Sequence, residues 1–325
     1  MCIRDSMNVG EAPGVTPARN EHITDPKNGE LDMLFLFDHV GVDQAVSKWD
    51  VVPFEVRNLR ARMADQQAAV KNAGWASLFF CNHDQPRVVS RWGNDSDRES
   101  RELSAKAFGM LLHMHRGTPY IYEGEELGMT NAHFTELGQY RDLEAINAYR
   151  QRVEEAKCQS SESMMAALAL IGRDNARTPM QWDASKYAGF TAADAATEPW
   201  ISVNPNRVEI NAAEEFDDPE SVYSFYKKLI AMRHNNATIA TGEWNLLDAD
   251  DDQVYAFTRT SGDDTILVIV NVSDKSSDVP TQVADLLAGG INESQVLLST
   301  YDAMRSVKSI ARGELARWEG VVIQL

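Results

Sequence analysis

The distribution of hydrophobic residues predicts a parallel β-sheet in the first part of the chain. Three short apolar runs, within residues 31–37, 75–80 and 118–122, each end abruptly in polar or charged residues. Apolar runs of this length without alternation are typical of strands buried on both faces. Between the second and third runs, apolar residues recur at helical spacing over 103–114. This alternation of strand and helix indicates a barrel or a doubly wound α/β sheet.

A change in sequence character predicts a second domain. The last helix of the first domain is predicted to start at Asp218 and Pro219, a capping residue followed by a proline at the first helical position, and to end at Asn235. Runs rich in Val, Ile, Leu and Thr then alternate with turn residues, at 253–260, 265–272, 295–299 and 320–325. Short strands at such spacing are typical of an antiparallel β-domain. We therefore expect one domain over 7–237 and a β-sandwich over 238–325.

The first six residues have no pattern that joins the strand predicted after them. They read Met-Cys-Ile-Arg-Asp-Ser and precede a second methionine, Met7. A charged region, an apolar core and a small-residue cleavage site do not follow in order, so the segment is not a secretory signal. We interpret residues 1–6 as a non-native leader and expect Met7 onward to be the interior of a longer protein.

Composition and charge exclude several classes of protein. With 43% hydrophobic and 25% charged residues, the chain has the mix of a packed globular protein. No apolar run approaches the roughly 18 residues of a membrane span, so a soluble protein without a membrane partner is expected. The net charge of −18 repels phosphate backbones, which argues against a nucleic-acid partner. Three cysteines without metal-type spacing indicate a reducing, cytoplasmic compartment.

Two polar clusters follow predicted strands and are candidates for chemistry. Asn-His-Asp-Gln-Pro-Arg, at 82–87, comes directly after an apolar run, and Glu11 stands between a short strand and a Gly/Pro turn. The carboxyl ends of barrel strands converge on one pocket, where working residues gather. Each cluster also has a structural alternative. His83 and Asp84 could form only a structural hydrogen bond, and Glu11 could be solvated.

Taken together, the motifs resemble the α-amylase superfamily and, within it, the α-glucosidase and oligo-1,6-glucosidase branch. Residues 9–16 (Val-Gly-Glu-Ala-Pro-Gly-Val-Thr) are similar to the segment after barrel strand five, and residues 82–91 to the segment after strand seven. Residues 117–131 and 172–183 extend the resemblance. It implies the C-terminal half of a (β/α)8 TIM barrel, strands five to eight, followed by an antiparallel β-sandwich domain.

The resemblance implies roles for individual residues. Glu11 matches the general acid/base that protonates the glycosidic oxygen and later activates water. Asp84 matches the carboxylate that binds sugar hydroxyls and favours an oxocarbenium-like transition state. His83 and Arg173 match residues that contact the same −1 glucose, and Arg177 is a candidate brace for the loop. A retaining enzyme also needs a nucleophilic carboxylate about 5–5.5 Å from the acid.

One element of the family pattern is missing from the chain. The family's nucleophile is an aspartate in a Gly-Phe-Arg-x-Asp-type string after strand four, and no such string occurs here. Asp38 follows a predicted strand but is expected to be a loop or packing residue, and His113 and His115 are expected to pack or to be solvated. Neither a metal nor a cofactor is expected. We therefore expect the chain to be a fragment of a longer enzyme. It lacks the half that carries the nucleophile and is expected to be inactive by itself.

The function that the resemblance implies is that of an exo-acting α-glucosidase. Such an enzyme releases glucose from the non-reducing end of short malto- or isomalto-oligosaccharides by a retaining mechanism. The preference for α-1,4 or α-1,6 linkages stays open, as does the oligomeric state. A trehalose-6-phosphate hydrolase of the same branch is an alternative, although the acidic charge weighs against an anionic substrate. A second alternative is a non-catalytic scaffold subunit. The joint presence of Glu11, His83, Asp84 and Arg173 argues against this alternative.

Overall fold

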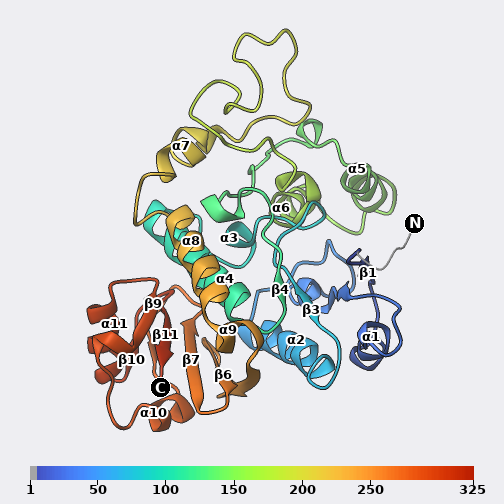
Figure 1. Cartoon of the computed structure of the whole chain (residues 1–325). Coiled ribbons are helices and arrows are strands. Elements are labelled where there is room, and N and C mark those ends of the chain that lie inside the picture. Colours follow the sequence, from blue (N-terminus) through green and yellow to red (C-terminus); the bar gives the residue numbers. More distant parts are fainter. Residues whose placement is uncertain (1–5) are drawn as a thin grey trace.

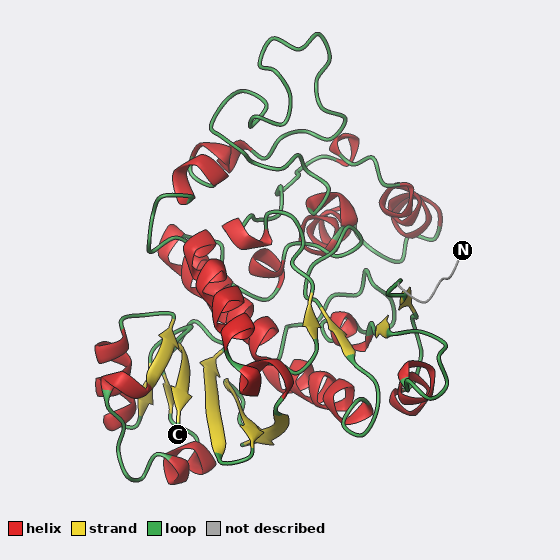
Figure 2. Cartoon of the chain, in the orientation of Figure 1, coloured by secondary structure: helices red, strands yellow, loops and turns green. Residues whose placement is uncertain are grey.

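The computed structural model describes residues 6–325, so of the predicted leader over residues 1–6 only Ser6 lies within the described part. Figure 1 shows a larger part built around short parallel strands and a smaller part at the C-terminus built around an antiparallel sheet. The strands form separate groups, and long loops cover much of the larger part (Figure 2).

Four short parallel strands form the sheet of the larger part, in the order β1-β2-β3-β4. They are β1 (Val9–Glu11), β2 (Met33–Phe35), β3 (Ala76–Leu78) and β4 (Thr118–Pro119). The last three lie inside the predicted apolar runs, which confirms the predicted parallel strands. In the register, Glu11 lies opposite Phe35 and Leu34 lies opposite Ala76. Because all four strands are parallel, their carboxyl ends share one edge of the sheet.

The first helices of this part connect the strands of the sheet, and the others follow β4 in the chain (Figure 1). The α-helices are α1 (Pro17–Thr24), α2 (Val56–Ala69), α3 (Val88–Arg91), α4 (Arg98–Met114), α5 (Leu143–Tyr149), α6 (Ser161–Ile171), α7 (Ala212–Glu215), α8 (Val222–Asn235) and α9 (Ala237–Thr241). Shorter helical turns are η2 (Asp38–Gly41), η3 (Glu125–Leu127), η4 (Leu137–Gln139), η6 (Arg173–Asn175) and η7 (Pro205–Val208), and η5 (Arg150–Glu155) is a π-helix.

Helix α4 is the buried core helix of the larger part. It contains the helix predicted from the spacing over 103–114 and starts earlier, where Asp97 accepts the backbone N–H of Ser100 at 2.9 Å. Its neighbour α8 packs closely along it, since a Cβ added to Gly109 would meet the ring of Tyr226 at 2.7 Å. The absence of a side chain at this position therefore allows the two helices to approach each other.

The predicted start of α8 at Asp218 and Pro219 is wrong by three residues. The helix starts at Val222, and the Ser221 hydroxyl caps it by accepting the N–H of Ser224 at 3.0 Å. Asp218 instead belongs to the preceding turn, where its backbone carbonyl accepts the Ser221 hydroxyl at 2.8 Å. The Asp218 side chain accepts the N–H of Glu220 at 2.9 Å, so it caps this turn and not the helix. The predicted end of the helix at Asn235 is confirmed.

The smaller part contains a five-stranded antiparallel sheet in the order β5-β6-β7-β11-β9. These strands are β5 (Glu243–Leu247), β6 (Val254–Ser261), β7 (Asp264–Asn271), β9 (Val296–Ser299) and β11 (Gly320–Gln324). Four of them match the predicted strands. The first, β5, is a half-exposed edge strand that pairs with β6 on one side, which explains why its sequence is a weak strand signal.

The outer face of this sheet is covered mainly by helices. Val283 of α10 (Thr281–Leu286) and Ile310 of α11 (Ala303–Ala311) pack with Leu267 and Val321 of the sheet. The pair formed by β8 (Ser277–Asp278) and β10 (Glu314–Leu315) is the only second sheet among the strands of the smaller part in residues 6–325. The second layer of the expected sandwich is therefore mostly helical.

The inner face of the sheet packs on the larger part. Tyr255, Phe257 and Val268 share one apolar core with α4 and α8. Buried Arg259 also joins the two parts, because its Nη1 donates to the Met114 carbonyl at 2.7 Å, at the end of α4. Within residues 6–325, none of the helices combines the length and the apolar character that a bilayer crossing requires.

Candidate functional site

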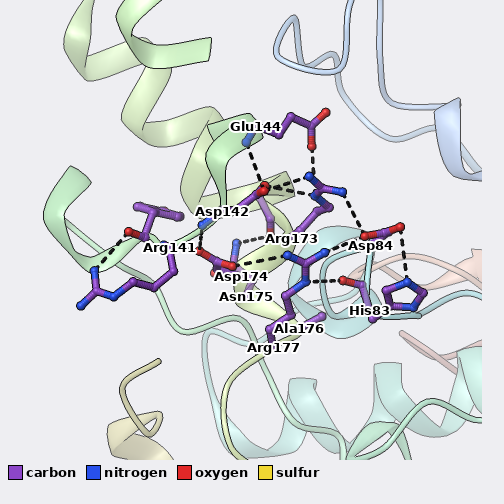
Figure 3. A network of polar contacts seen from close by, with 12 residues as sticks. His83, Asp84, Arg141, Asp142, Glu144, Arg173, Asp174, Asn175, Ala176 and Arg177 are labelled. Carbon is purple, nitrogen blue, oxygen red and sulfur yellow. Dashed lines mark hydrogen bonds and ion pairs between the residues drawn. The ribbon is translucent and has the colours of Figure 1, made fainter. Parts of the chain in front are cut away.

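Asp84 lies at the centre of a charged network beyond the carboxyl end of β3 (Figure 3). Its backbone N–H donates to Oδ1 of Asn82 at 2.7 Å, which holds the residue in a tight turn. Its Oδ1 accepts hydrogen bonds from Nη1 of Arg173 at 3.1 Å and from Nη2 of Arg177 at 2.7 Å. Nε2 of His83 lies 3.5 Å from the other oxygen, Oδ2. The structure thus brings three predicted site residues together, His83, Asp84 and Arg173.

Arg173 is oriented by carboxylates from the start of α5. Asp142 accepts its Nε at 3.1 Å and its Nη2 at 2.8 Å, and Oε2 of Glu144 lies 3.1 Å from its Nε. The hydrogen bonds to Asp142 raise the pKa of Arg173 above its ordinary value. Burial is the largest single influence on Asp142 and opposes its ionisation, but the hydrogen bonds from Arg173 and from the Glu144 N–H, together with the charges of Arg173 and Arg177, lower its pKa on balance. Both groups are therefore charged at neutral pH.

Arg177 braces the loop that carries Asp84. Its Nε donates to the carbonyl of His83 at 2.7 Å, and its Nη1 lies 3.8 Å from Asp174. Asp174 is buried and accepts the backbone N–H groups of Arg141 at 2.6 Å and Asp142 at 2.8 Å. The predicted bracing contact of Arg177 is present, and a direct bond to the Asp84 carboxylate accompanies it.

Glu11 stands apart from this network. It is exposed at the end of β1, two strands from β3 in the same parallel sheet. Neighbouring strands lie about 4.8 Å apart, so the ends of β1 and β3 are roughly 10 Å apart. Within residues 6–325, no hydrogen bond or ion pair joins Glu11 to Asp84, and the two carboxylates share only the sheet edge.

Sequence reasoning missed the carboxylates that hold Arg173. Asp142 and Glu144 precede Arg173 by about thirty residues and form no recognised motif. The one local signal is that of a helix start, since Asp142 caps α5 by accepting the N–H of Glu144 at 3.1 Å. Lys48, from the segment after η2, lies 2.9 Å from Glu144 and extends the network further.

Other titratable residues are structural. His113 and His115 are buried in or at the end of α4, and burial lowers their pKa values to about 4 and about 3. Both histidines pack in the core, which is one of the two alternatives expected for them. Asp38 lies exposed in η2. Among residues 6–325, no three His, Cys, Asp or Glu side chains are grouped as a metal site.

Glu125, in the loop after β4, is buried and accepts the hydroxyl of Tyr226 at 3.1 Å. Burial raises the pKa of Glu125 to about 7. The carboxyl therefore changes its charge close to neutral pH, inside the core beside α8.

The sequence matches two protein-family descriptions. Residues 1–242 match "Alpha amylase, catalytic domain", and residues 244–291 match "Maltogenic Amylase, C-terminal domain". An oligo-1,6-glucosidase of Parageobacillus thermoglucosidasius is 42% identical over 99% of this chain and 55% of its own length. A glucan 1,6-alpha-glucosidase of Streptococcus dysgalactiae subsp. equisimilis is 42% identical over 99% of this chain and 57% of its own.

Solved structures of other proteins superpose on nearly all of this chain. Trehalose-6-phosphate hydrolase of Bacillus licheniformis superposes with a TM-score of 0.86 at 37% identity, over 98% of this chain and 56% of that one. Isomaltulose synthase from Klebsiella sp. LX3 superposes with a TM-score of 0.87 at 33% identity, over 98% and 55%. The chain spans about half the length of each of these relatives.

Proposed function

Because the chain belongs to the α-amylase family, with a TIM-barrel fold and an antiparallel C-terminal sheet domain, we propose that it carries the acid and sugar-binding residues of an exo-acting α-glucosidase. The enzyme would release glucose from the non-reducing end of short malto- or isomalto-oligosaccharides in the cytoplasm. The observation that carries this proposal is the Asp84 carboxylate, fixed by Arg173 and Arg177 at the sheet edge where Glu11 also lies.

The barrel is proposed to be completed by polypeptide outside these 325 residues. The four parallel strands β1 to β4 would be barrel strands five to eight, within a domain over 7–237, and residues 238–325 would form the second domain. Two observations support this arrangement. The sheet is open at β1 and at β4, and the relatives are nearly twice as long as the chain.

The proposed chemistry divides the reaction between the two parts of the barrel. Glu11 would protonate the glycosidic oxygen and later activate water, while the nucleophilic carboxylate would come from the other half. Oδ1 of Asp84 is occupied by two guanidinium groups, which leaves Oδ2 to accept sugar hydroxyls. His83 would contact the same sugar, and Arg173 would close over it. Because Asp84 is held before substrate arrives, little reorganisation is needed in the transition state.

Trehalose-6-phosphate hydrolase is the second candidate, because one of the superposed structures carries that name. A phosphate-bearing substrate needs a cation that is free to bind it. Arg173, Arg177 and Lys48 each already pair with a carboxylate. This charge pairing and the net charge of −18 favour the neutral oligosaccharide.

A chimeric enzyme tests the proposal directly. Residues 7–325 would be joined to the N-terminal part of the Parageobacillus thermoglucosidasius oligo-1,6-glucosidase that aligns before them, giving a completed enzyme. We expect glucose from isomaltose or maltose in the α-configuration, detected by NMR during hydrolysis, and release of glucose from the same substrates at least 100-fold slower in Glu11→Gln. A folded, monodisperse completed enzyme without this activity would refute the proposal, and preferential cleavage of trehalose-6-phosphate would replace it with the second candidate.

A further inference from the structure

Asn131 joins the two segments that carry Asp84 and Arg173. It lies after η3 and is fully buried. Its Oδ1 accepts the backbone N–H of Arg87 at 3.0 Å. Its Nδ2 donates to the carbonyls of Ala169 and Leu170 at 3.0 and 2.9 Å, at the end of α6. A single amide side chain therefore links two segments that are distant in the sequence.

The linked positions lie close to the charged network. Arg87 follows Asp84 by three residues, and Leu170 precedes Arg173 by three residues. Between these points, the segments meet again where Arg173 contacts Asp84 at 3.1 Å. The two segments thus have two buried attachments, at Asn131 and through the 3.3 Å bond from Nη2 of Arg87 to the Ala176 carbonyl, and partly exposed contacts at the network itself.

The backbone of Asn131 is itself held in place on both sides. Its backbone N–H donates to the Ser90 hydroxyl at 2.8 Å, and its carbonyl accepts Nδ2 of buried Asn204 at 3.0 Å. The end of α6 is also fixed, because Nδ2 of Asn175 donates to the carbonyls of Leu168 and Gly172, both at 3.0 Å. Neither side of the link can therefore shift without breaking buried hydrogen bonds, which is costly in free energy.

We propose that Asn131 is a positioning residue that sets the separation of Asp84 and Arg173, a proposal that rests on the proposed function of the site. The link needs one acceptor and two donors on a short side chain, and asparagine supplies both. Aspartate keeps the acceptor but has no donor, and it would place a carboxylate against two carbonyl oxygens. Glutamine is longer by one methylene and would move one segment relative to the other.

The second domain offers a matched control, Asn271. This residue is also fully buried, and its Nδ2 donates to the carbonyls of Lys275 and Ala316 at 2.7 and 2.8 Å. Its Oδ1 accepts the hydroxyl of Ser273 at 3.0 Å. Asn271→Asp therefore removes the same kinds of bonds as Asn131→Asp but at a distance from the network.

Hydrogen exchange of the full chain tests the link without any measurement of activity. In Asn131→Asp we expect backbone amides within 85–91 and 169–175 to exchange at least tenfold faster, with β7 unchanged. In Asn271→Asp we expect faster exchange in β7 and unchanged exchange within 85–91 and 169–175. Uniformly faster exchange in Asn131→Asp would reflect only lost stability and would overturn the proposal, as would wild-type exchange in both segments. Ser90→Ala, which removes one support of Asn131, gives a milder variant with the same expected pattern.

Kinetics of the completed enzyme provide the second readout. We expect Asn131→Asp to lower kcat/KM for isomaltose at least tenfold at a temperature where both variants are folded, while Asn271→Asp stays within twofold of wild type. Local loosening without a change in kcat/KM would overturn the positioning role. If the completed wild-type enzyme is inactive, the proposed function fails, and the exchange experiment still decides whether Asn131 fixes the two segments.

Discussion

The carboxylate of Asp142 fixes the guanidinium of Arg173 through two hydrogen bonds, of 3.1 and 2.8 Å. These bonds occupy Nε and Nη2 and direct Nη1 toward Asp84. A planar guanidinium bound in this way has a defined orientation, which a single contact would not impose. Asp142 therefore determines how Arg173 faces the proposed sugar site.

The first prediction concerns Asp142→Asn in the completed enzyme. The amide keeps one acceptor for Arg173 but loses the charge and the second hydrogen bond. Hydrogen bonds to charged groups contribute about 1.5–3 kcal/mol each, so kcat/KM should fall about 10- to 100-fold. Glu99→Gln is the control. It removes a carboxylate that binds a different arginine, Arg317, in a contact between the two domains. Equal kinetics for Asp142→Asn and wild type would show that Arg173 keeps its orientation without this contact.

The fold was largely predictable because several of its strands lie in apolar, buried runs. Such runs stand out from any neighbouring helix, as β3 does with all three of its residues buried. The edge strand β5 was missed because only one neighbour covers it and its sequence mixes charged, aromatic and amide residues. The start of α8 was misplaced because two capping residues, Asp218 and Ser221, lie within one turn of each other.

The candidate site was predictable only where family motifs run continuously along the sequence. His83, Asp84 and Arg173 belong to such motifs, and the structure brings them together. Asp142 and Asn131 act through contacts with segments far away in the sequence. Nothing in local spacing distinguishes Asp142 from an ordinary helix cap, so its partner becomes visible only in the folded chain.

The second prediction tests Glu11 as the general acid. In the completed enzyme, Glu11→Gln should lower kcat for isomaltose at least 100-fold, since general acid catalysis contributes about 10²–10⁴. Activated aryl α-glucosides need little protonation to depart, so glycosylation from them should fall far less. Glu30→Gln changes an exposed residue that pairs with His22, and it should match wild type. If both kinds of substrate lose activity equally, Glu11 does not act as the acid.

The third prediction concerns substrate choice. The completed enzyme should hydrolyse isomaltose or maltose with a kcat/KM at least tenfold above that for trehalose-6-phosphate, about 1.4 kcal/mol of transition-state discrimination. The reason is the pairing of Arg173, Arg177 and Lys48 with carboxylates. Initial rates measured with a glucose assay and a glucose-6-phosphate assay decide between the substrates. A preference for the phosphorylated sugar would mean that another cation binds the phosphate.

The fourth prediction concerns the contact between α4 and α8. Gly109→Ala would place a methyl group 2.7 Å from the Tyr226 ring. Overpacking of this kind costs about 1–3 kcal/mol, and better helix propensity returns about 1 kcal/mol. A lower Tm is therefore expected, by roughly 1–3 °C for a chain of this size. Gly289→Ala should leave Tm unchanged, because an added Cβ there meets nothing within 4 Å. An unchanged or higher Tm for Gly109→Ala would show that the helices separate at little cost.

The fifth prediction follows from the buried carboxyl of Glu125, whose pKa burial raises to about 7. Below the ordinary value of about 4.5, the carboxyl is neutral in both the folded and the unfolded chain. Between about 4.5 and 7, only the unfolded chain loses the proton, so this group makes the folded state less stable as pH rises. Above about 7 the effect is constant and amounts to about 3 kcal/mol.

The difference between Glu125→Gln and wild type isolates this group from the buried histidines, which act in the opposite direction. The amide cannot ionise, and its oxygen can still accept the Tyr226 hydroxyl. Relative to wild type, the variant should therefore gain about 3 kcal/mol of unfolding free energy between pH 4.5 and pH 8, measured by urea denaturation. A flat difference for Glu125→Gln would mean that the Glu125 carboxyl ionises in the folded chain as readily as in the unfolded one.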